Sequence, residues 1–204
     1  PWLSYRDIEI GMCPVRALRV AYTGELGWEL HHPIEMQNYL LDILLSSGKE
    51  FNLKLVGARA QNWLRQEKSY KAFGSDLGRD AGPFESNLSR FVDINKNFLG
   101  KDALLKRKTD VSCVTLLIDG PKDIDPWGRE ALYNETEEVM LGRLTSAGYS
   151  VHFKRSIGIG YVKSSFSEVG TKLRIKIDDA FWDAEIVQDS PYDPQNERII
   201  DRVQ

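Results

Sequence analysis

The sequence of 204 residues has few side chains that cross-link or bind metals, with only two cysteines and three histidines. Cys13 and Cys113 lie far apart, and neither belongs to a Cys-x-x-Cys or Cys/His spacing. We therefore expect no zinc site, no disulfide framework and a reducing compartment. Long apolar runs are also absent, because Asp42 interrupts the longest stretch. That stretch is far shorter than the roughly 20 residues of a membrane span, so we expect none.

An excess of positive charge is lacking too. The chain has 27 Lys and Arg residues and 30 Asp and Glu residues, which gives a formal net charge of −3. Such a chain has no basic field for a phosphate backbone, which makes nucleic acid a poor candidate for the main partner. The 42% hydrophobic content is ordinary for a globular protein with a sizeable core. A small-molecule ligand suits this composition better.

The first ten residues lack a start methionine and the charged-then-apolar order of a secretory signal. We therefore interpret the chain, which opens on Pro1, as part of a longer protein. On that interpretation any active site is incomplete within these residues, and the portion taken alone is expected to be inactive.

The first half of the chain combines strand and helix patterns. Two β-rich stretches surround the segment Thr23–Gly27, with apolar residues alternating up to it, and predict a hairpin. Helical spacing then predicts an amphipathic helix ended by Gly48 and a second helix over residues 57–70. A glycine-rich loop over 73–85 and short helices at 83–91 and 100–106 are expected to follow.

The second half changes to short apolar runs at close spacing from residue 111 onward. Runs of this length, separated by Gly, Asp and Ser, predict an antiparallel barrel or sandwich. We place the domain boundary in the charged stretch near residue 108, which divides the chain into residues 1–108 and 109–204.

Two local patterns resemble functional motifs, but the residues around them argue against those functions. Gly158 and Gly160 superficially resemble a dinucleotide loop, but a strand rather than a helix continues after them. We expect these glycines to allow another segment to approach closely. Adjacent His31 and His32 point to opposite faces of a strand and cannot easily bind one ion, so structural or solvated roles are expected for them and for His152.

Glu29 is the most informative side chain, because a carboxylate on a strand beside Trp28 and apolar neighbours needs a partner. An ion pair with Arg19 or Arg65 is the simpler explanation of the pattern. The alternative is a ligand with a two-nitrogen donor face, such as the aminopyrimidine ring of a pterin, since a carboxylate accepts two parallel hydrogen bonds.

Several separate segments decide between these alternatives. The stretches RALRVAYTGELGWELHHP, LRQEKSYKAFGSDLGRDAGPFESNL and NFLGKDALL, then LTSAGYSVHFKRSIGIGYVKSSFSEVGTKLRIKI and SPYDPQNERI, together cover nearly the whole chain. In this order the chain resembles the aminomethyltransferase (glycine cleavage T-protein) superfamily, and most closely the C-terminal region of sarcosine and dimethylglycine dehydrogenases. The resemblance implies an α+β portion, with an antiparallel sheet and flanking helices, followed by a C-terminal antiparallel, jelly-roll-like β-barrel.

The resemblance also implies the site. Glu29, at the end of the family's Tyr-Thr-Gly-Glu-x-Gly-aromatic-Glu motif, would bind the pterin ring of tetrahydrofolate, and Tyr22 would line the same site. Alternation along the strand would turn Trp28 away from Glu29 and into the core. Arg65 and Arg198 are candidate contacts for the carboxylates of the folate tail, as are Arg59 and Tyr192. Solvated ion pairs are the alternative for these arginines.

Three departures from the family pattern matter. Gln61 stands where T-proteins have an arginine that helps to bind folate, which favours the dehydrogenase branch. Asn87 replaces a glycine common in relatives, and Asn is well suited to a positive φ. The family's catalytic aspartate lies upstream of the portion matched here, so no catalytic residue is expected in this chain.

The resemblance implies a parent enzyme that oxidises an N-methyl amine such as sarcosine or dimethylglycine on an FAD domain outside this chain. The oxidised carbon would pass to tetrahydrofolate and give 5,10-methylenetetrahydrofolate. The expected partners are folate, a small methylated amine and the upstream flavin domain, in a bacterial cytoplasm or a mitochondrial matrix. A stand-alone aminomethyltransferase, a folate-dependent demethylase and a non-catalytic folate-binding module are the alternatives.

Overall fold

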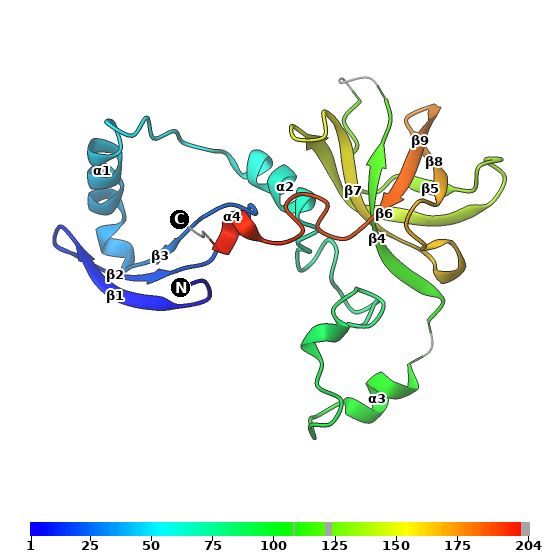
Figure 1. Ribbon diagram of the computed structural model, residues 1–204, viewed down its shortest axis with the longest axis horizontal. Coiled ribbons are helices and arrows are strands. Elements are labelled where there is room, and N and C mark those ends of the chain that lie inside the picture. Colours follow the sequence, from blue (N-terminus) through cyan, green and yellow to red (C-terminus); the bar gives the residue numbers. More distant parts are fainter. Residues whose placement is uncertain (108, 121–123, 201–204) are drawn as a thin grey trace. The chain divides into compact units, whose positions relative to one another are not determined.

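The computed structural model describes residues 1–107, 109–120 and 124–200 (Figure 1). The described residues form two compact units. The first consists of Pro1–Leu64 together with the segment that begins at Asp193, and the second is Arg65–Tyr192. Helix α2 (Ala58–Glu67) spans the division between them.

The first unit is built on a three-stranded antiparallel sheet in the order β1-β2-β3. Alternate residues of β2, namely Cys13, Val15 and Ala17, are buried and pack with Leu40 of the helix that covers this face. That alternation is the pattern of a sheet with one covered and one open face. The elements are β1 (Tyr5–Ile10), β2 (Cys13–Leu18), β3 (Glu29–His31), η1 (Ile34–Met36), α1 (Gln37–Ser47) and α4 (Glu197–Ile200).

The predicted hairpin is confirmed in its pairing but not in its extent. Strands β2 and β3 are antiparallel neighbours, with Leu18 opposite Glu29. Residues 19–28 between them are a loop, so Tyr22 does not lie on a strand as the alternating pattern suggested. The apolar residues of that pattern, Leu18, Val20 and Tyr22, are only partly buried, whereas Arg19 between them is buried.

The second unit contains the predicted barrel. Six strands close in the order β4-β7-β6-β5-β8-β9, and β9 pairs again with β4. All neighbours are antiparallel, and leucine, isoleucine and valine side chains fill the interior. The strands are β4 (Val111–Ile118), β5 (Ala131–Tyr133), β6 (Met140–Ser150), β7 (Arg155–Lys163), β8 (Lys172–Ile177) and β9 (Ala180–Val187), with η3 (Ser164–Phe166) after β7.

The helices from α2 to the start of the barrel agree in part with those predicted from the sequence. Helix α3 (Lys101–Lys106) agrees with the prediction for residues 100–106, and α2 lies within the range predicted for the second helix. The predicted helix over 83–91 is wrong, since only the 3-10 turn η2 (Ser89–Phe91) forms. Asn87, with a φ of 57°, interrupts that segment in the left-handed region, which also confirms the positive φ expected for this residue.

The close approach predicted for the glycines of β7 is also confirmed. A Cβ added to Gly160 would lie 2.5 Å from the carbonyl oxygen of Arg143 on the neighbouring strand β6. A Cβ on Gly158 would meet the side chain of Leu144 at 3.0 Å. These two positions let β6 and β7 pack without a side chain between them.

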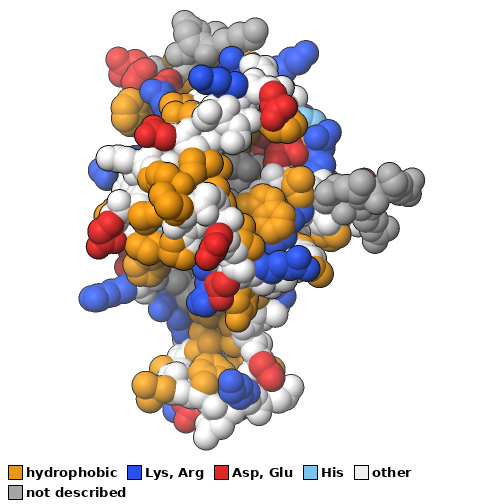
Figure 2. Space-filling model, turned by 90° about the vertical axis from the view of Figure 1, so that its left-hand side faces the viewer, with side chains coloured by type: hydrophobic (Ala, Val, Ile, Leu, Met, Phe, Trp, Pro, Cys, Tyr) orange, Lys and Arg blue, Asp and Glu red, His pale blue; other side chains and the backbone are white. Residues whose placement is uncertain are grey.

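The surface carries many large hydrophobic side chains beside its charged ones. Figure 2 shows hydrophobic side chains in patches on one face, with Lys, Arg, Asp and Glu between them. Exposed examples from the first unit include Met12, Trp28, Ile34, Phe51 and Leu55. None of the described helices combines the length and the apolar character needed to cross a bilayer.

Candidate functional site

The loop of residues 19–28 carries the motif that the sequence singled out. Gly24, at its tip, has a φ of 83°, which few other residues adopt without strain. A Cβ on Gly27 would lie 2.7 Å from the Cβ of Ala21, so the two sides of the loop touch at this point. The two glycines of the motif therefore have distinct roles, one at the turn and one at the close approach.

Glu29 is the first residue of β3, and about half of its carboxylate side chain is exposed. Its Oε2 lies 3.4 Å from Nε2 of His31, two residues further along the same face of the strand. Of the two arginines considered as ion-pair partners for Glu29, Arg19 uses its guanidinium on backbone carbonyls and Arg65 pairs with Asp76. The carboxylate of Glu29 is thus available to a ligand.

The open face of the sheet continues from Glu29 on β3 across β2 to β1. Leu18 lies opposite Glu29, and Arg16 lies opposite His31. Asp7 on β1 accepts hydrogen bonds from Nε and Nη2 of Arg16, at 2.8 and 3.1 Å. An open depression of about 850 Å³ lies over this face, lined by Asp7, Ile8, Glu9, Pro14, Val15, Arg16, Leu18, His31 and Pro33.

The position of Trp28 differs from the prediction. It was expected in the core, but 58% of the residue is exposed. The alternation rule does not apply to it, since the strand begins only at Glu29. Its ring lies against the guanidinium of Arg19, with 5.2 Å between the Arg19 Cζ and the ring centroid.

Arg19, considered from the sequence only as an ion-pair partner of Glu29, has different contacts in the structure. The residue is 4% exposed, and its guanidinium donates to the carbonyl oxygens of Gly27 at 3.2 Å and Ile199 at 2.8 Å. A buried arginine between apolar neighbours indicates a specific set of acceptors. The charged residue within the otherwise apolar alternation before Tyr22 was the available signal in the sequence.

Arg198 lies on α4, close to the same loop. Its Nη1 is 3.6 Å from Oε2 of Glu25, and the two side chains are 62% and 44% exposed. Exposed pairs of this kind contribute little to stability. Asp193 accepts hydrogen bonds from the backbone nitrogens of Glu197 and Arg198 and so caps this short helix.

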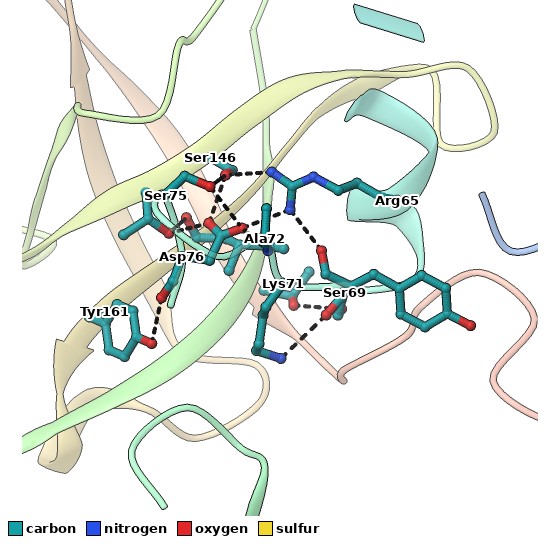
Figure 3. A network of polar contacts seen from close by, with 12 residues as sticks. Arg65, Ser69, Lys71, Ala72, Ser75, Asp76, Ser146 and Tyr161 are labelled. Atoms are coloured by element: carbon teal, nitrogen blue, oxygen red, sulfur yellow. Dashed lines mark hydrogen bonds and ion pairs between the residues drawn. The ribbon is translucent and has the colours of Figure 1, made fainter. Parts of the chain in front are cut away.

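Arg65 belongs to the second unit and lies in a buried polar network (Figure 3). Its Nη1 donates to Asp76 and to the carbonyl oxygen of Tyr70, each at 2.7 Å, and its Nη2 donates to Ser146 Oγ at 2.7 Å. The side chains of Arg65 and Asp76 are 3% and 0% exposed. Asp76 also accepts from Thr145 and Ser146 on β6, so this network joins the segment after α2 to the barrel.

Two further sequence candidates have described contacts. The ring of Tyr192 lies 4.7 Å from that of His152, and its backbone nitrogen donates to the carbonyl oxygen of Glu67. Arg59 lies over the ring of Trp63 on α2, with 5.2 Å to its centroid. Within the described ranges, no three His, Cys, Asp or Glu side chains are grouped so as to bind a metal ion.

Comparison with known proteins matches both halves of the chain. Residues 1–96 match the GCVT N-terminal domain family, and residues 112–193 match the glycine cleavage T-protein C-terminal barrel domain. The mitochondrial dimethylglycine dehydrogenase of Mus musculus is 36% identical over 195 residues, which cover 92% of this chain and 22% of that protein. The chain therefore spans about a fifth of the length of such relatives.

Two shorter proteins are also similar. An aminomethyltransferase of Caldanaerobacter subterraneus subsp. tengcongensis is 32% identical over 160 residues, or 78% of this chain and 42% of that protein. The crystal structure of the glycine cleavage system aminomethyltransferase T from Bartonella henselae superposes with a TM-score of 0.77. It shares 22% identity and covers 87% of this chain and 50% of its own, a likeness that concerns the fold.

Proposed function

Since the chain belongs to the aminomethyltransferase (glycine cleavage T-protein) superfamily, we propose that its first unit binds the pterin ring of tetrahydrofolate. The observation that carries this proposal is the carboxylate of Glu29, which is half exposed beside the open face of the sheet. An ionised carboxylate offers lone pairs for two parallel N–H donors, and the aminopyrimidine edge of a pterin presents such a pair.

In this proposal Glu29 orients the ring, and Tyr22 in the preceding loop lines the same site. The contact with His31 is long, at 3.4 Å, and involves one oxygen of Glu29, so each oxygen keeps lone-pair capacity for a hydrogen bond from the ligand. Bound tetrahydrofolate would supply the nitrogens that accept a one-carbon unit. The contribution of this chain is positioning and exclusion of water, and we assign no catalytic residue to it.

The two candidate tail contacts fit the proposal differently. The side chain of Arg198 is 62% exposed, and its contact with Glu25 is a surface pair with 3.6 Å between the charged atoms, so a folate carboxylate can reach the guanidinium. Arg65 has three short hydrogen bonds within a buried network. We propose Arg198 as a tail contact and give Arg65 a supporting role in the barrel unit, with its predicted contact to folate as the alternative.

For the whole protein we propose an N-methyl amine dehydrogenase whose FAD domain lies outside this chain. The one-carbon unit from a substrate such as dimethylglycine or sarcosine would pass to tetrahydrofolate and give 5,10-methylenetetrahydrofolate. Similarity to dimethylglycine dehydrogenase over 92% of the chain supports this branch, as does Gln61 in place of the family's arginine. We propose a mitochondrial matrix or a bacterial cytoplasm as the location of this enzyme. The upstream flavin domain is the proposed partner of this chain.

Similarity to an aminomethyltransferase supports a second candidate, a stand-alone transferase. The two differ in what precedes the chain. A Gly-x-Gly-x-x-Gly strand-turn-helix for flavin upstream would support the dehydrogenase, and its absence would support the transferase. A folate-binding module without turnover is the third alternative, and assays of the full-length protein with folate and a methylated amine distinguish it.

Calorimetric titration of folinic acid into the full-length protein tests the site. We expect Glu29→Gln to weaken binding by about tenfold or more, because a charge-assisted hydrogen-bond pair is lost. Glu35→Gln makes the same change of charge at another exposed residue of the first unit and is expected to bind as the unmodified protein does. Equal affinity in the two variants, or no binding to the unmodified protein, would contradict the role of Glu29.

A further inference from the structure

We propose that Arg19 is a positioning residue, which sets the shape of the loop 19–28 and thereby the relation between Tyr22 and Glu29. This inference rests on the proposed folate site. It arises from the contacts of one buried side chain, whose two carbonyl acceptors come from the far end of the loop and from α4.

The backbone of Arg19 is fixed to the sheet. Its nitrogen donates to the carbonyl oxygen of Ser4 at 2.8 Å, and its carbonyl oxygen accepts from the nitrogen of Leu3 at 3.1 Å. These bonds extend the pairing of β1 with β2 by one step beyond Leu18. The residue from which the loop departs is therefore anchored before the loop begins.

The side chain of Arg19 then closes the loop. Its Nη1 donates to the carbonyl oxygen of Gly27, so the first residue of the loop is bonded to the residue two positions before Glu29. The close packing of Gly27 against Ala21 reinforces this closure, because a Cβ at Gly27 would lie only 2.7 Å from the Cβ of Ala21. Tyr22 lies within the closed loop, and Glu29 directly follows it.

A third contact ties the loop to the other end of the chain. Nη2 of Arg19 donates to the carbonyl oxygen of Ile199 at 2.8 Å, and Ile199 itself is 0% exposed. The exposed pair of Arg198 with Glu25 lies between the same two segments. Helix α4 therefore supports the loop from outside, through one buried contact and one exposed contact.

These contacts require the planar fork of arginine. A guanidinium donates in two directions from a rigid plane and also presents a flat face to the ring of Trp28. A lysine ammonium keeps the charge, but it cannot reach two carbonyl groups and an aromatic face in the same geometry. Arg19→Lys thus separates the geometry of this side chain from its charge.

The experiment compares Arg19→Lys with Leu40→Ala in the full-length protein. Leu40 is 3% exposed and packs between α1 and the sheet, so its truncation destabilises the same unit without altering a contact of the loop. For Arg19→Lys we expect the affinity for folinic acid to fall about tenfold. Hydrogen exchange should become faster in residues 20–28 and remain unchanged in β1 and β2. For Leu40→Ala, measured at a temperature where it is folded, we expect an affinity within threefold of the unmodified protein.

Two outcomes would overturn the inference. One is unchanged affinity in Arg19→Lys while Glu29→Gln binds weakly, which leaves the folate site intact and removes the role of Arg19. The other is faster exchange throughout the sheet and α1, which indicates general destabilisation. If Arg19→Lys does not fold, Gly27→Ala replaces it, because the added methyl disturbs the same closure. Equal binding of Glu29→Gln and the unmodified protein would instead contradict the proposed function itself.

Discussion

The carboxylate of Asp76 and the guanidinium of Arg65 form a buried ion pair, with 2.7 Å between Arg65 Nη1 and Asp76 Oδ2. Removal of one partner leaves an uncompensated charge in the interior, which costs about 3–5 kcal/mol. We expect Asp76→Ala to lower the free energy of unfolding of the barrel unit by this order, measured by urea denaturation. Asp7→Ala, which breaks the exposed pair with Arg16, is the control and should change stability little. Equal losses in both variants would contradict the structural importance of the buried pair.

Gly160 of β7 should not accept a side chain. A Cβ there would lie 2.5 Å from the carbonyl oxygen of Arg143 and 3.0 Å from the Cα of Leu144, and backbone atoms cannot move aside cheaply. We expect Gly160→Ala to lower the thermal midpoint clearly or to prevent folding. At Gly78 nothing lies within 4 Å of an added Cβ, so Gly78→Ala should fold normally. A stable Gly160→Ala protein would mean that β6 and β7 are less closely packed than described.

Asn87 combines a positive φ with a hydrogen bond from its Nδ2 to the carbonyl oxygen of Cys113, at 2.8 Å. Asn87→Ala loses the bond and places alanine in the left-handed conformation, which costs such a residue roughly 1–2 kcal/mol. Asn87→Gly loses the bond but tolerates the conformation. We therefore expect the alanine variant to be the less stable of the two in urea denaturation. The reverse order would show that backbone entropy outweighs the strain at this residue.

The thiol of Cys113 should be inert in the folded protein. Burial raises the pKa of Cys113 from 9.0 to about 12, and the side chain is almost inaccessible. Since the thiolate is the reactive form, we expect Ellman's reagent at pH 8 to modify Cys113 only after the protein is denatured. Fast modification in the native protein, assigned by peptide mass, would contradict the burial of this residue.

The same pKa predicts a loss of stability in alkali. Below pH 9 the thiol of Cys113 is protonated in both the folded and the unfolded chain, and the full stability is present. Between pH 9 and about pH 12 the unfolded chain loses this proton first, so unfolding becomes more favourable as the pH rises. Tyr161, whose pKa burial also raises to about 12, acts in the same direction above pH 10. Cys113→Ala should show a smaller fall in thermal midpoint between pH 9 and pH 11.

Local patterns were sufficient for much of the architecture. Short apolar runs predicted the barrel, helical spacing predicted α1 and α2, and the glycines of β7 indicated a close approach. These features depend on neighbours in the sequence, because burial of one face of a strand or helix imposes a short period on the chain. The motif around Glu29 was equally visible, since its residues are nearly contiguous.

Only the tertiary structure decided the partners of the polar side chains. The sequence contains no sign that Arg19 reaches Ile199, or that Arg65 meets Asp76 and Ser146. Such pairs are set by how separate segments pack, and the local sequence around a charged residue does not specify which distant residue it contacts. For the same reason the prediction for Trp28 failed, because its exposure depends on where β3 begins and on the guanidinium behind its ring.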